Sequence, residues 1–148
     1  MADYKIKFNK KRCISCQACE VHCKMKNRVP VGIALNRIEC SDPVMGKNGT
    51  PEIKNKYVPC MMCKNPDCMA ACPTGAIIQR ADGLVLLVKE ECIGCGACVE
   101  ACPFDVMAFD EAENKAMKCD YCLDRIEQGL DPACVTGCTT KALSFVRP

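Results

Sequence analysis

The side chains of this chain best suited to chemistry are its cysteines, which number 17 among 148 residues. Sixteen of them fall into four runs, in which neighbouring cysteines are mostly separated by two or three intervening residues. Thiolates at such short intervals are typical ligands of soft metal ions and of iron–sulfur clusters. Cys40 stands outside every run, and we expect that it is not a ligand. The runs are Cys13-x2-Cys16-x2-Cys19-x3-Cys23, Cys60-x2-Cys63-x4-Cys68-x3-Cys72, Cys92-x2-Cys95-x2-Cys98-x3-Cys102 and Cys119-x2-Cys122-x11-Cys134-x3-Cys138.

Three kinds of cysteine-rich site compete for these runs. A disulfide scaffold is typical of exported proteins with an even cysteine count, whereas this count is odd and residues 1–8 lack the apolar segment of a secretory signal. Structural zinc uses two well-separated ligand pairs per ion rather than tight triplets. The third run, closed by Pro103, matches the C-x2-C-x2-C-x3-C-P pattern of bacterial ferredoxins, in which three cysteines bind one cluster and the fourth binds another. The spacing therefore predicts four 4Fe-4S clusters.

The predicted clusters leave little room for catalysis. A 4Fe-4S cluster held by four thiolates has no open coordination site on iron, and sixteen thiols saturate four clusters. One-electron transfer is the chemistry that remains, so we expect a non-catalytic electron-transfer protein with no catalytic residue. The sequence leaves two alternatives open: a free-standing soluble polyferredoxin, and a scaffold whose clusters mainly hold an assembly together.

The elements that must position the thiols are short. The first run aligns with the third and the second with the fourth, an internal repeat that predicts tandem ferredoxin-like modules of α+β class around the clusters. Residue patterns and turn signals predict strands at 4–8, 76–79, 84–88, 106–109, 115–118 and 143–146. Helices are expected at 18–25, 67–72, 97–102 and 122–128, with Pro66 and Pro132 at helix starts, and residues 41–55 are expected to form a surface excursion.

Charge and composition exclude several classes of partner. The formal net charge is +2, with acidic and basic residues interspersed, so we expect no nucleic-acid partner. No apolar run reaches the ~18–20 residues of a membrane span, so we expect no direct membrane insertion and a cytoplasmic location. Aromatic residues are 5% and Trp is absent, which predicts that the chain needs its metal clusters in order to fold.

With these motifs, the chain resembles the four-cluster iron–sulfur subunits of molybdenum and tungsten pterin oxidoreductases, such as dimethyl sulfoxide reductase, formate dehydrogenase and polysulfide reductase. The resemblance implies an electron-transfer subunit of a hetero-oligomer, between a catalytic pterin subunit and a second electron carrier. A hydrogenase-linked relay is the related alternative. The resemblance rests on Cys13-Ile-Ser-Cys-Gln-Ala-Cys-Glu-Val-His-Cys23, Cys60-Met-Met-Cys63, Cys72-Pro-Thr-Gly-Ala76, Pro103-Phe104 and Lys118-Cys-Asp-Tyr-Cys-Leu-Asp-Arg125.

The grouping of the cysteines is left open by spacing, which permits either a nested or a sequential pairing of the runs. The resemblance implies the nested scheme, in which run one pairs with run four and run two with run three. It also implies one polyferredoxin unit over residues 1–148, with an inner half at about 57–110 and an outer half at about 1–56 plus 111–148. The implied ligand sets are Cys13/Cys16/Cys19/Cys138, Cys23/Cys119/Cys122/Cys134, Cys60/Cys63/Cys68/Cys102 and Cys72/Cys92/Cys95/Cys98.

One departure from the internal repeat follows Cys138. Pro73, Thr74 and Gly75 follow Cys72, whereas residues 139–141 are Thr, Thr and Lys. A threonine adds a backbone N–H and a hydroxyl where proline has neither, and the lysine adds a positive charge. Donors to sulfur and nearby positive charge favour the reduced cluster, so we predict a raised potential for the cluster that Cys138 shares.

Overall fold

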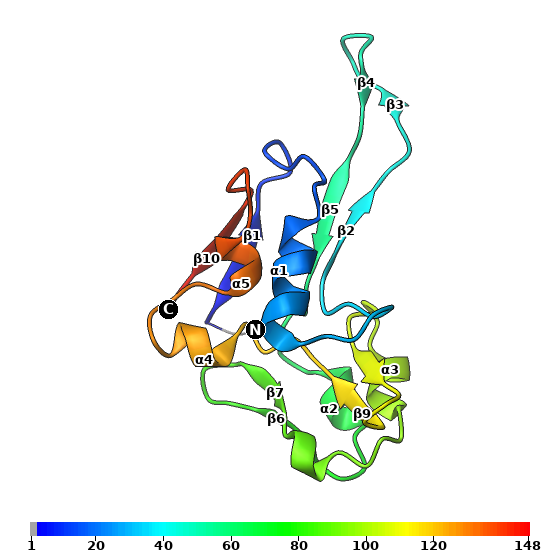
Figure 1. Cartoon of the computed structure of the whole chain (residues 1–148), viewed down its shortest axis with the longest axis vertical. Coiled ribbons are helices and arrows are strands. Elements are labelled where there is room, and N and C mark those ends of the chain that lie inside the picture. Colours follow the sequence, from blue (N-terminus) through cyan, green and yellow to red (C-terminus); the bar gives the residue numbers. More distant parts are fainter. Residues whose placement is uncertain (1–2) are drawn as a thin grey trace.

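Short helices and short pairs of antiparallel strands alternate along the chain, which the computed structural model describes from residue 3 to residue 148. Figure 1 shows their arrangement, and within these residues every sheet is two-stranded. This mixture confirms the predicted α+β class. The helices are α1 (Ala18–Asn27), α2 (Asp67–Ala70), α3 (Ala97–Ala101), α4 (Leu123–Ile126), α5 (Ala133–Thr136) and the 3-10 turn η1 (Lys89–Glu91). The strands are β1 (Lys5–Phe8), β2 (Arg37–Cys40), β3 (Val44–Met45), β4 (Pro51–Glu52), β5 (Asn55–Val58), β6 (Ile77–Gln79), β7 (Val85–Leu87), β8 (Ala108–Asp110), β9 (Lys115–Met117) and β10 (Leu143–Val146).

Two local hairpins lie where the sequence predicts them. In β6–β7, Ile77 is opposite Leu87, and the carboxylate of Asp82 accepts the N–H of Leu84 in the turn. The second hairpin, β8–β9, has its own aspartate turn, since Asp110 accepts two backbone N–H groups. Aspartate favours such turns because its short side chain mimics a backbone acceptor.

Helices α1 and α3 occupy equivalent places in the sequence repeat but differ in length. Each follows a residue with positive φ, Gln17 at 60° before α1 and Gly96 at 75° before α3. Helix α3 stops after one turn because Pro103 forces the preceding Cys102 out of the helical region. Lys24 stands at the equivalent place after run one, so α1 continues to ten residues.

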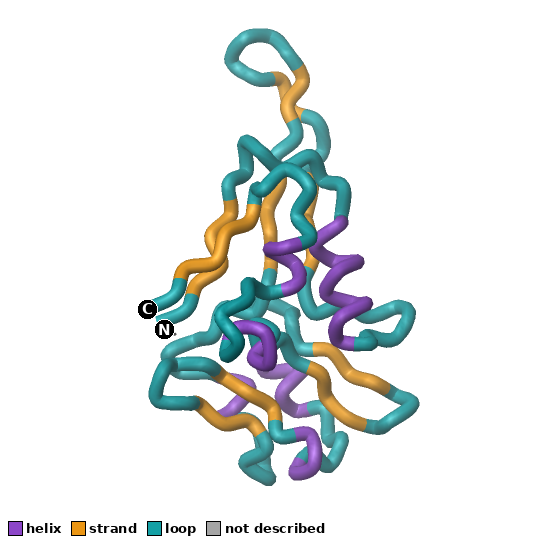
Figure 2. Tube along the Cα trace, turned by 60° about the vertical axis from the view of Figure 1, so that its left-hand side comes forward, coloured by secondary structure: helices purple, strands orange, loops and turns teal. Residues whose placement is uncertain are grey.

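Strands from far apart in the sequence also pair. β1 and β10 are antiparallel, with Lys5 opposite Val146, so the two ends of the described chain lie side by side (Figure 2). Tyr4 stacks on Phe145, which packs edge-on against Tyr121. The aromatic cluster joins this strand pair to the core.

Residues 37–58, which we call the arm, extend away from the rest of the molecule (Figure 1). Strands β2 and β5 form its base and β3 and β4 its outer part. The excursion predicted at 41–55 is exposed along nearly all its length, but the strands on either side of it were not predicted. Arg37 ties the base to the opposite half by donating to the carbonyl oxygens of Phe104 and Asp105.

The buried core is divided into three clusters, and cysteines are part of each, fully or partly buried. The largest contains Met62, Ile77, Leu84 and Val85, each at most 2% exposed. No helix among residues 3–148 is both long and apolar enough to cross a membrane.

Candidate metal centres

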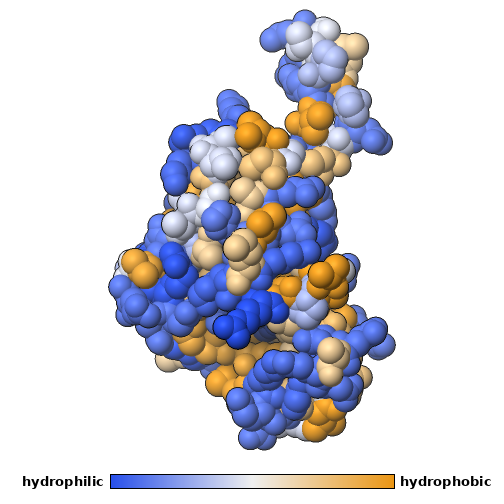
Figure 3. Space-filling view, viewed as in Figure 1, coloured by the Kyte–Doolittle hydropathy of each residue, from blue (hydrophilic) through white to orange (hydrophobic). Residues whose placement is uncertain are grey.

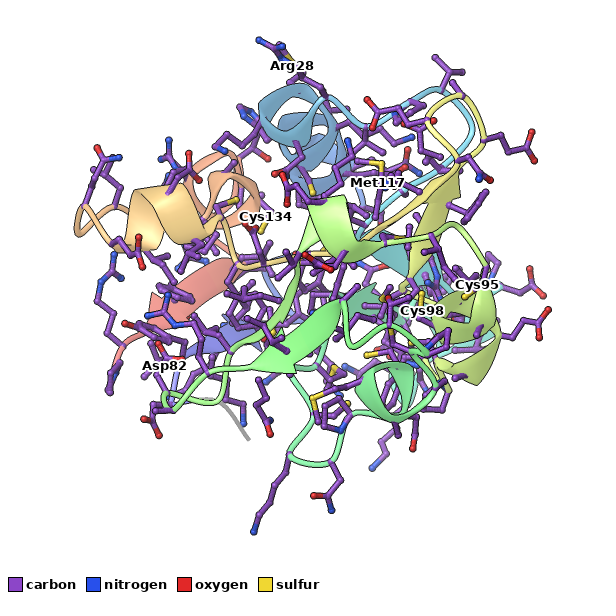
Figure 4. The ribbon with its side chains drawn as sticks, turned by 90° about the horizontal axis from the view of Figure 1, so that it is seen from below. Arg28, Asp82, Cys95, Cys98, Met117 and Cys134 are labelled. Carbon is purple, nitrogen blue, oxygen red and sulfur yellow. The ribbon has the colours of Figure 1, made fainter. Side chains whose placement is uncertain are left out.

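The sixteen cysteines of the runs gather in four groups, each with three members from one run and one from another. Three of the groups each line a small cavity whose walls are mostly apolar. Figure 4 shows Cys95 and Cys98 of one group beside each other around the start of α3, with Cys134 of another group apart from them on α5. We name the groups site A (Cys13, Cys16, Cys19, Cys138), site B (Cys23, Cys119, Cys122, Cys134), site C (Cys60, Cys63, Cys68, Cys102) and site D (Cys72, Cys92, Cys95, Cys98).

Site B is recognised because its thiols influence one another's pKa and because Cys119 packs against the buried cluster that contains Cys23. Burial raises the pKa of Cys23 to about 12, and Cys134 and Cys122 contribute to the rise. Burial also raises the pKa of Cys119 well above its usual range, with contributions from Cys60 and Cys23. Cys23 therefore lies with run four, as Cys138 lies with run one.

Influences between thiols of different sites give the order of the sites in the molecule. Burial raises the pKa of Cys19 in site A to about 11, and Cys134 of site B adds to it. Cys119 of site B is influenced by Cys60 of site C. Cys98 of site D, whose pKa is raised mainly by burial, is influenced by Cys68 of site C. The sites thus follow one another as A, B, C and D.

The loops between the cysteines have a backbone suited to wrapping a cluster. Ser15 and Gln17 in run one, and Gly94 and Gly96 in run three, all have positive φ. A β-carbon on Gly94 would lie 2.3 Å from the carbonyl oxygen of Asn114, so only glycine fits there. Such turns present backbone N–H groups to negatively charged ligands.

A backbone N–H group and a threonine hydroxyl form hydrogen bonds with thiols of site A. The N–H of Ala142 donates to Cys138 Sγ at 3.2 Å. The hydroxyl of Thr139 lies 3.3 Å from Cys16 Sγ and is the largest cause of the lowered pKa of that exposed thiol. Partial burial raises the pKa of Cys138, but N–H donors from Leu143 and Ala142 outweigh it and lower the pKa overall.

Tyr57 provides a test of whether these sites fit an iron–sulfur cluster. Its hydroxyl is buried and has no well-formed hydrogen bond among the described residues, and the group that it faces is Cys134, whose pKa it lowers. Burial raises its pKa well above the usual range, and Cys134 of site B is the next largest influence. A buried hydroxyl needs an acceptor, which a thiolate or sulfide of a cluster at site B would supply.

The spacing of the thiols points to a cluster rather than to a single ion. Among residues 3–148 no three His, Cys, Asp or Glu side chains are close enough to hold one metal ion. Four cysteines around a cavity, with backbone donors and apolar walls, match the requirements of a 4Fe-4S cluster. The residues present therefore fit this cofactor at sites A, C and D, and site B supplies the same set of four thiols.

Two further candidates lie outside the sites. Cys40 is exposed at the end of β2, and its thiol donates to the hydroxyl of Ser15 at 3.2 Å. His22, the single histidine of the chain, is exposed on α1 and lies against Gly137, which directly follows α5. Sequence reasoning missed Tyr57, because nothing in the sequence around it marks it as a neighbour of a cysteine in run four.

Comparison with known proteins places the chain among iron–sulfur proteins. Residues 53–147 match the family described as "4Fe-4S dicluster domain". The chain is 41% identical over 145 residues to the thiosulfate reductase electron transfer subunit of Salmonella typhi, covering 97% of this chain and 76% of that protein. It is 38% identical to a subunit of tetrathionate reductase from Salmonella typhimurium, over 91% of this chain and 54% of that protein. It is also 38% identical to the nitrate-inducible formate dehydrogenase iron–sulfur subunit of Escherichia coli, over 97% of this chain and 55% of that protein. The chain thus spans only about half the length of the latter two relatives.

Proposed function

The chain belongs to the family of 4Fe-4S electron-transfer subunits of molybdenum and tungsten pterin oxidoreductases, and we propose that it relays electrons between such a catalytic subunit and a second redox carrier. With sixteen cysteines in four runs, it carries four 4Fe-4S clusters. Each such cluster supplies one-electron redox chemistry when bound. The chain's own contribution is to hold the clusters, shield them from water and set their potentials.

The observation that best supports this proposal is the succession of sites A to D, in which a thiol of each site is influenced by the charge of a thiol in the next: Cys19 by Cys134, Cys119 by Cys60, and Cys98 by Cys68. Such a succession suits transfer because each site has a near neighbour to exchange with. In every site, as we propose, four thiolates complete the cluster's coordination. This leaves no position for a substrate and supports a non-catalytic role.

The proposed ligands are the sixteen cysteines of sites A to D, with Cys40 excluded. Sites C and D draw only on runs two and three, and sites A and B only on runs one and four. This division supports tandem ferredoxin-like modules, an inner half at about 57–110 and an outer half made of the remaining residues. A catalytic partner and a second carrier at the two ends of this succession would form a hetero-oligomer; the cytoplasmic location stays a prediction.

The test is to purify the tagged chain without oxygen from its native cells and to analyse the intact complex by native mass spectrometry and metal analysis. We expect a larger subunit in equal amount that contains molybdenum or tungsten. Substrates of the relatives' enzymes, such as formate or tetrathionate, should then change the paramagnetic resonance spectra of the clusters. A chain that purifies alone, or with a nickel-containing hydrogenase, would contradict the proposal.

A further inference from the structure

Lys118 lies at the junction of sites B and C, directly after β9, whose last residue Met117 is labelled in Figure 4. Its ammonium donates to Cys60 Sγ at 3.1 Å. It also donates to the carbonyl oxygens of Val85 at 2.6 Å and of Cys119 at 3.0 Å. One side chain therefore connects a cysteine of site C with the backbone of a cysteine of site B.

The charge of Lys118 has no carboxylate to balance it. The ammonium is part-buried and forms no ion pair within the described residues, whereas Lys24, Lys26 and Lys89 each pair with an acidic side chain. Taking a charge out of water is costly unless an opposite charge compensates. The acceptors at hand are the carbonyl oxygens of Val85 and Cys119, the uncharged sulfur of Met62 and the sulfur of Cys60, so the compensating negative charge comes from the Cys60 thiolate and the cluster that it holds.

The influence of this charge extends to both sites. Burial raises the pKa of Cys68 in site C, and the Lys118 charge opposes that rise. The same is true of Cys119 in site B, where burial dominates and Lys118 again acts in the opposite direction. The contacts of Lys118 with Cys60 Sγ and with the carbonyl oxygen of Cys119 place its charge beside one cysteine of each group.

Lys118 also lines a hollow, where water can weaken the effect of its charge on distant groups. The hollow has a volume of about 320 Å³ and is visible in Figure 3 between the end of α1 and the lower part of the molecule. Lys89 and Asp120 share its walls with apolar side chains. Water in this hollow screens the charge toward the distant sites A and D, whereas Cys60 is in direct contact with it.

We propose that Lys118 raises the midpoint potentials of the clusters at sites B and C, and that of site C most, because its charge lies between these two sites. The inference rests on the proposed function, since it assumes a cluster at each site. Reduction takes a bound 4Fe-4S cluster from its 2+ to its 1+ state by one electron, with no bond made or broken. The added negative charge is stabilised by a neighbouring cation and by a donor to its sulfur.

The experiment is a redox titration of the isolated holoprotein with dithionite as reductant, followed by paramagnetic resonance. In Lys118→Gln we expect the equilibrium constant for reduction at site C to fall about tenfold, or about 59 mV for one electron. Site B should shift less in the same direction, and sites A and D should stay unchanged. Lys118→Arg, which keeps the charge, should restore the wild-type order of potentials.

Lys64→Gln is the matched control, because Lys64 follows Cys63 of site C but is exposed to water. It should leave all four potentials unchanged. If Lys118→Gln binds the full complement of iron and its potentials equal those of the wild type, or if all four clusters shift alike, the proposal is wrong.

A failure to assemble clusters is also informative. Loss of iron in both Lys118→Gln and Lys118→Met, with full iron in Lys118→Arg, would support a required charge; loss in all three would overturn it. A wild-type chain without four clusters would instead contradict the proposed function, so the two failures are distinguishable.

Discussion

Thr139 places its hydroxyl 3.3 Å from Cys16 Sγ, at a position where the other half of the internal repeat has Pro73. A donor to a cluster thiolate favours the reduced state. We therefore expect Thr139→Val, which keeps the shape and removes the hydroxyl, to lower the midpoint potential of site A in a redox titration.

Thr74→Val is the matched control for this prediction. The hydroxyl of Thr74 donates to the carbonyl oxygen of Glu91 at 2.8 Å and lies 3.7 Å from Cys72 Sγ, so it is already engaged elsewhere. Because this hydroxyl also lies near Cys72 and lowers the pKa of that thiol, its removal should lower the potential of site D, but by less than Thr139→Val lowers that of site A. An unchanged site A in Thr139→Val would show that the hydroxyl does not act on the cluster. Lys141, the other departure in this segment, is exposed, and its charge is therefore screened by water.

Cys40 is expected to be dispensable for cluster binding, because its exposed thiol contacts Ser15 and lies outside sites A to D. Cys40→Ser should retain about sixteen iron atoms and sixteen sulfides per chain, which four 4Fe-4S clusters require. Iron and acid-labile sulfide assays measure this. Cys134→Ser is the contrast, since it should lose the signal of site B; loss of a signal in Cys40→Ser would instead make Cys40 a ligand.

The sixteen cysteines could be predicted from the sequence because cluster ligands within one run are neighbours along the chain. Their partners from other runs could not, since spacing alone permits Cys138 to join either of two runs. Tyr57 acts on Cys134, and Lys118 acts on Cys60, although the partners in each pair are far apart in the sequence. Only the folded chain brings such side chains to the sulfurs.

The side chain of His22 on α1 lies over Gly137, directly after α5, in the space that a β-carbon at 137 would occupy. A β-carbon there would lie 2.1 Å from the imidazole Cδ2 of His22, although the φ of −80° at Gly137 suits any residue. We expect Gly137→Ala to reduce the free energy of unfolding by about 1 kcal/mol, the low end of the cost of overpacking, because the exposed His22 side chain can turn away. Thermal unfolding of the holoprotein, followed by circular dichroism, measures this.

The double variant His22→Ala with Gly137→Ala separates steric conflict from other causes. With the imidazole removed, the alanine at 137 fits, so the double variant should be close in stability to His22→Ala alone. If the two substitutions instead destabilise additively, the contact between α1 and α5 does not explain the glycine.

Elements with a local cause are the ones that could be predicted. The turn at Asp82 and Gly83 predicted the β6–β7 hairpin, and Pro132 predicted the start of α5. The pairing of β1 with β10 and of β2 with β5 could not be predicted, because each joins segments that no short-range pattern relates. The extra length of α1 follows from the missing proline after Cys23 but was underestimated by two residues.

The whole molecule depends on its clusters for a core. Six cysteines of the sites are buried, and burial raises the pKa of two of them, Cys23 and Cys134, to about 12 and about 11. Removal of iron with a chelator should therefore unfold the chain, because the remaining apolar core is too small to stand alone. Loss of the far-ultraviolet circular dichroism signal together with iron release measures this. A chain that keeps its signal without iron would show that the apolar core suffices.

Site A joins the two ends of the chain, and this has a consequence for biosynthesis. Thr139, which faces Cys16 of site A, lies 123 residues further along the chain, whereas the cysteines of sites C and D all precede Cys119. The ribosome therefore finishes the proposed ligand sets of sites C and D first. The proposed set of site A, which includes Cys16, stays incomplete until Cys138 has been synthesised. The order of the cysteines along the chain therefore allows sites C and D to be completed before sites A and B.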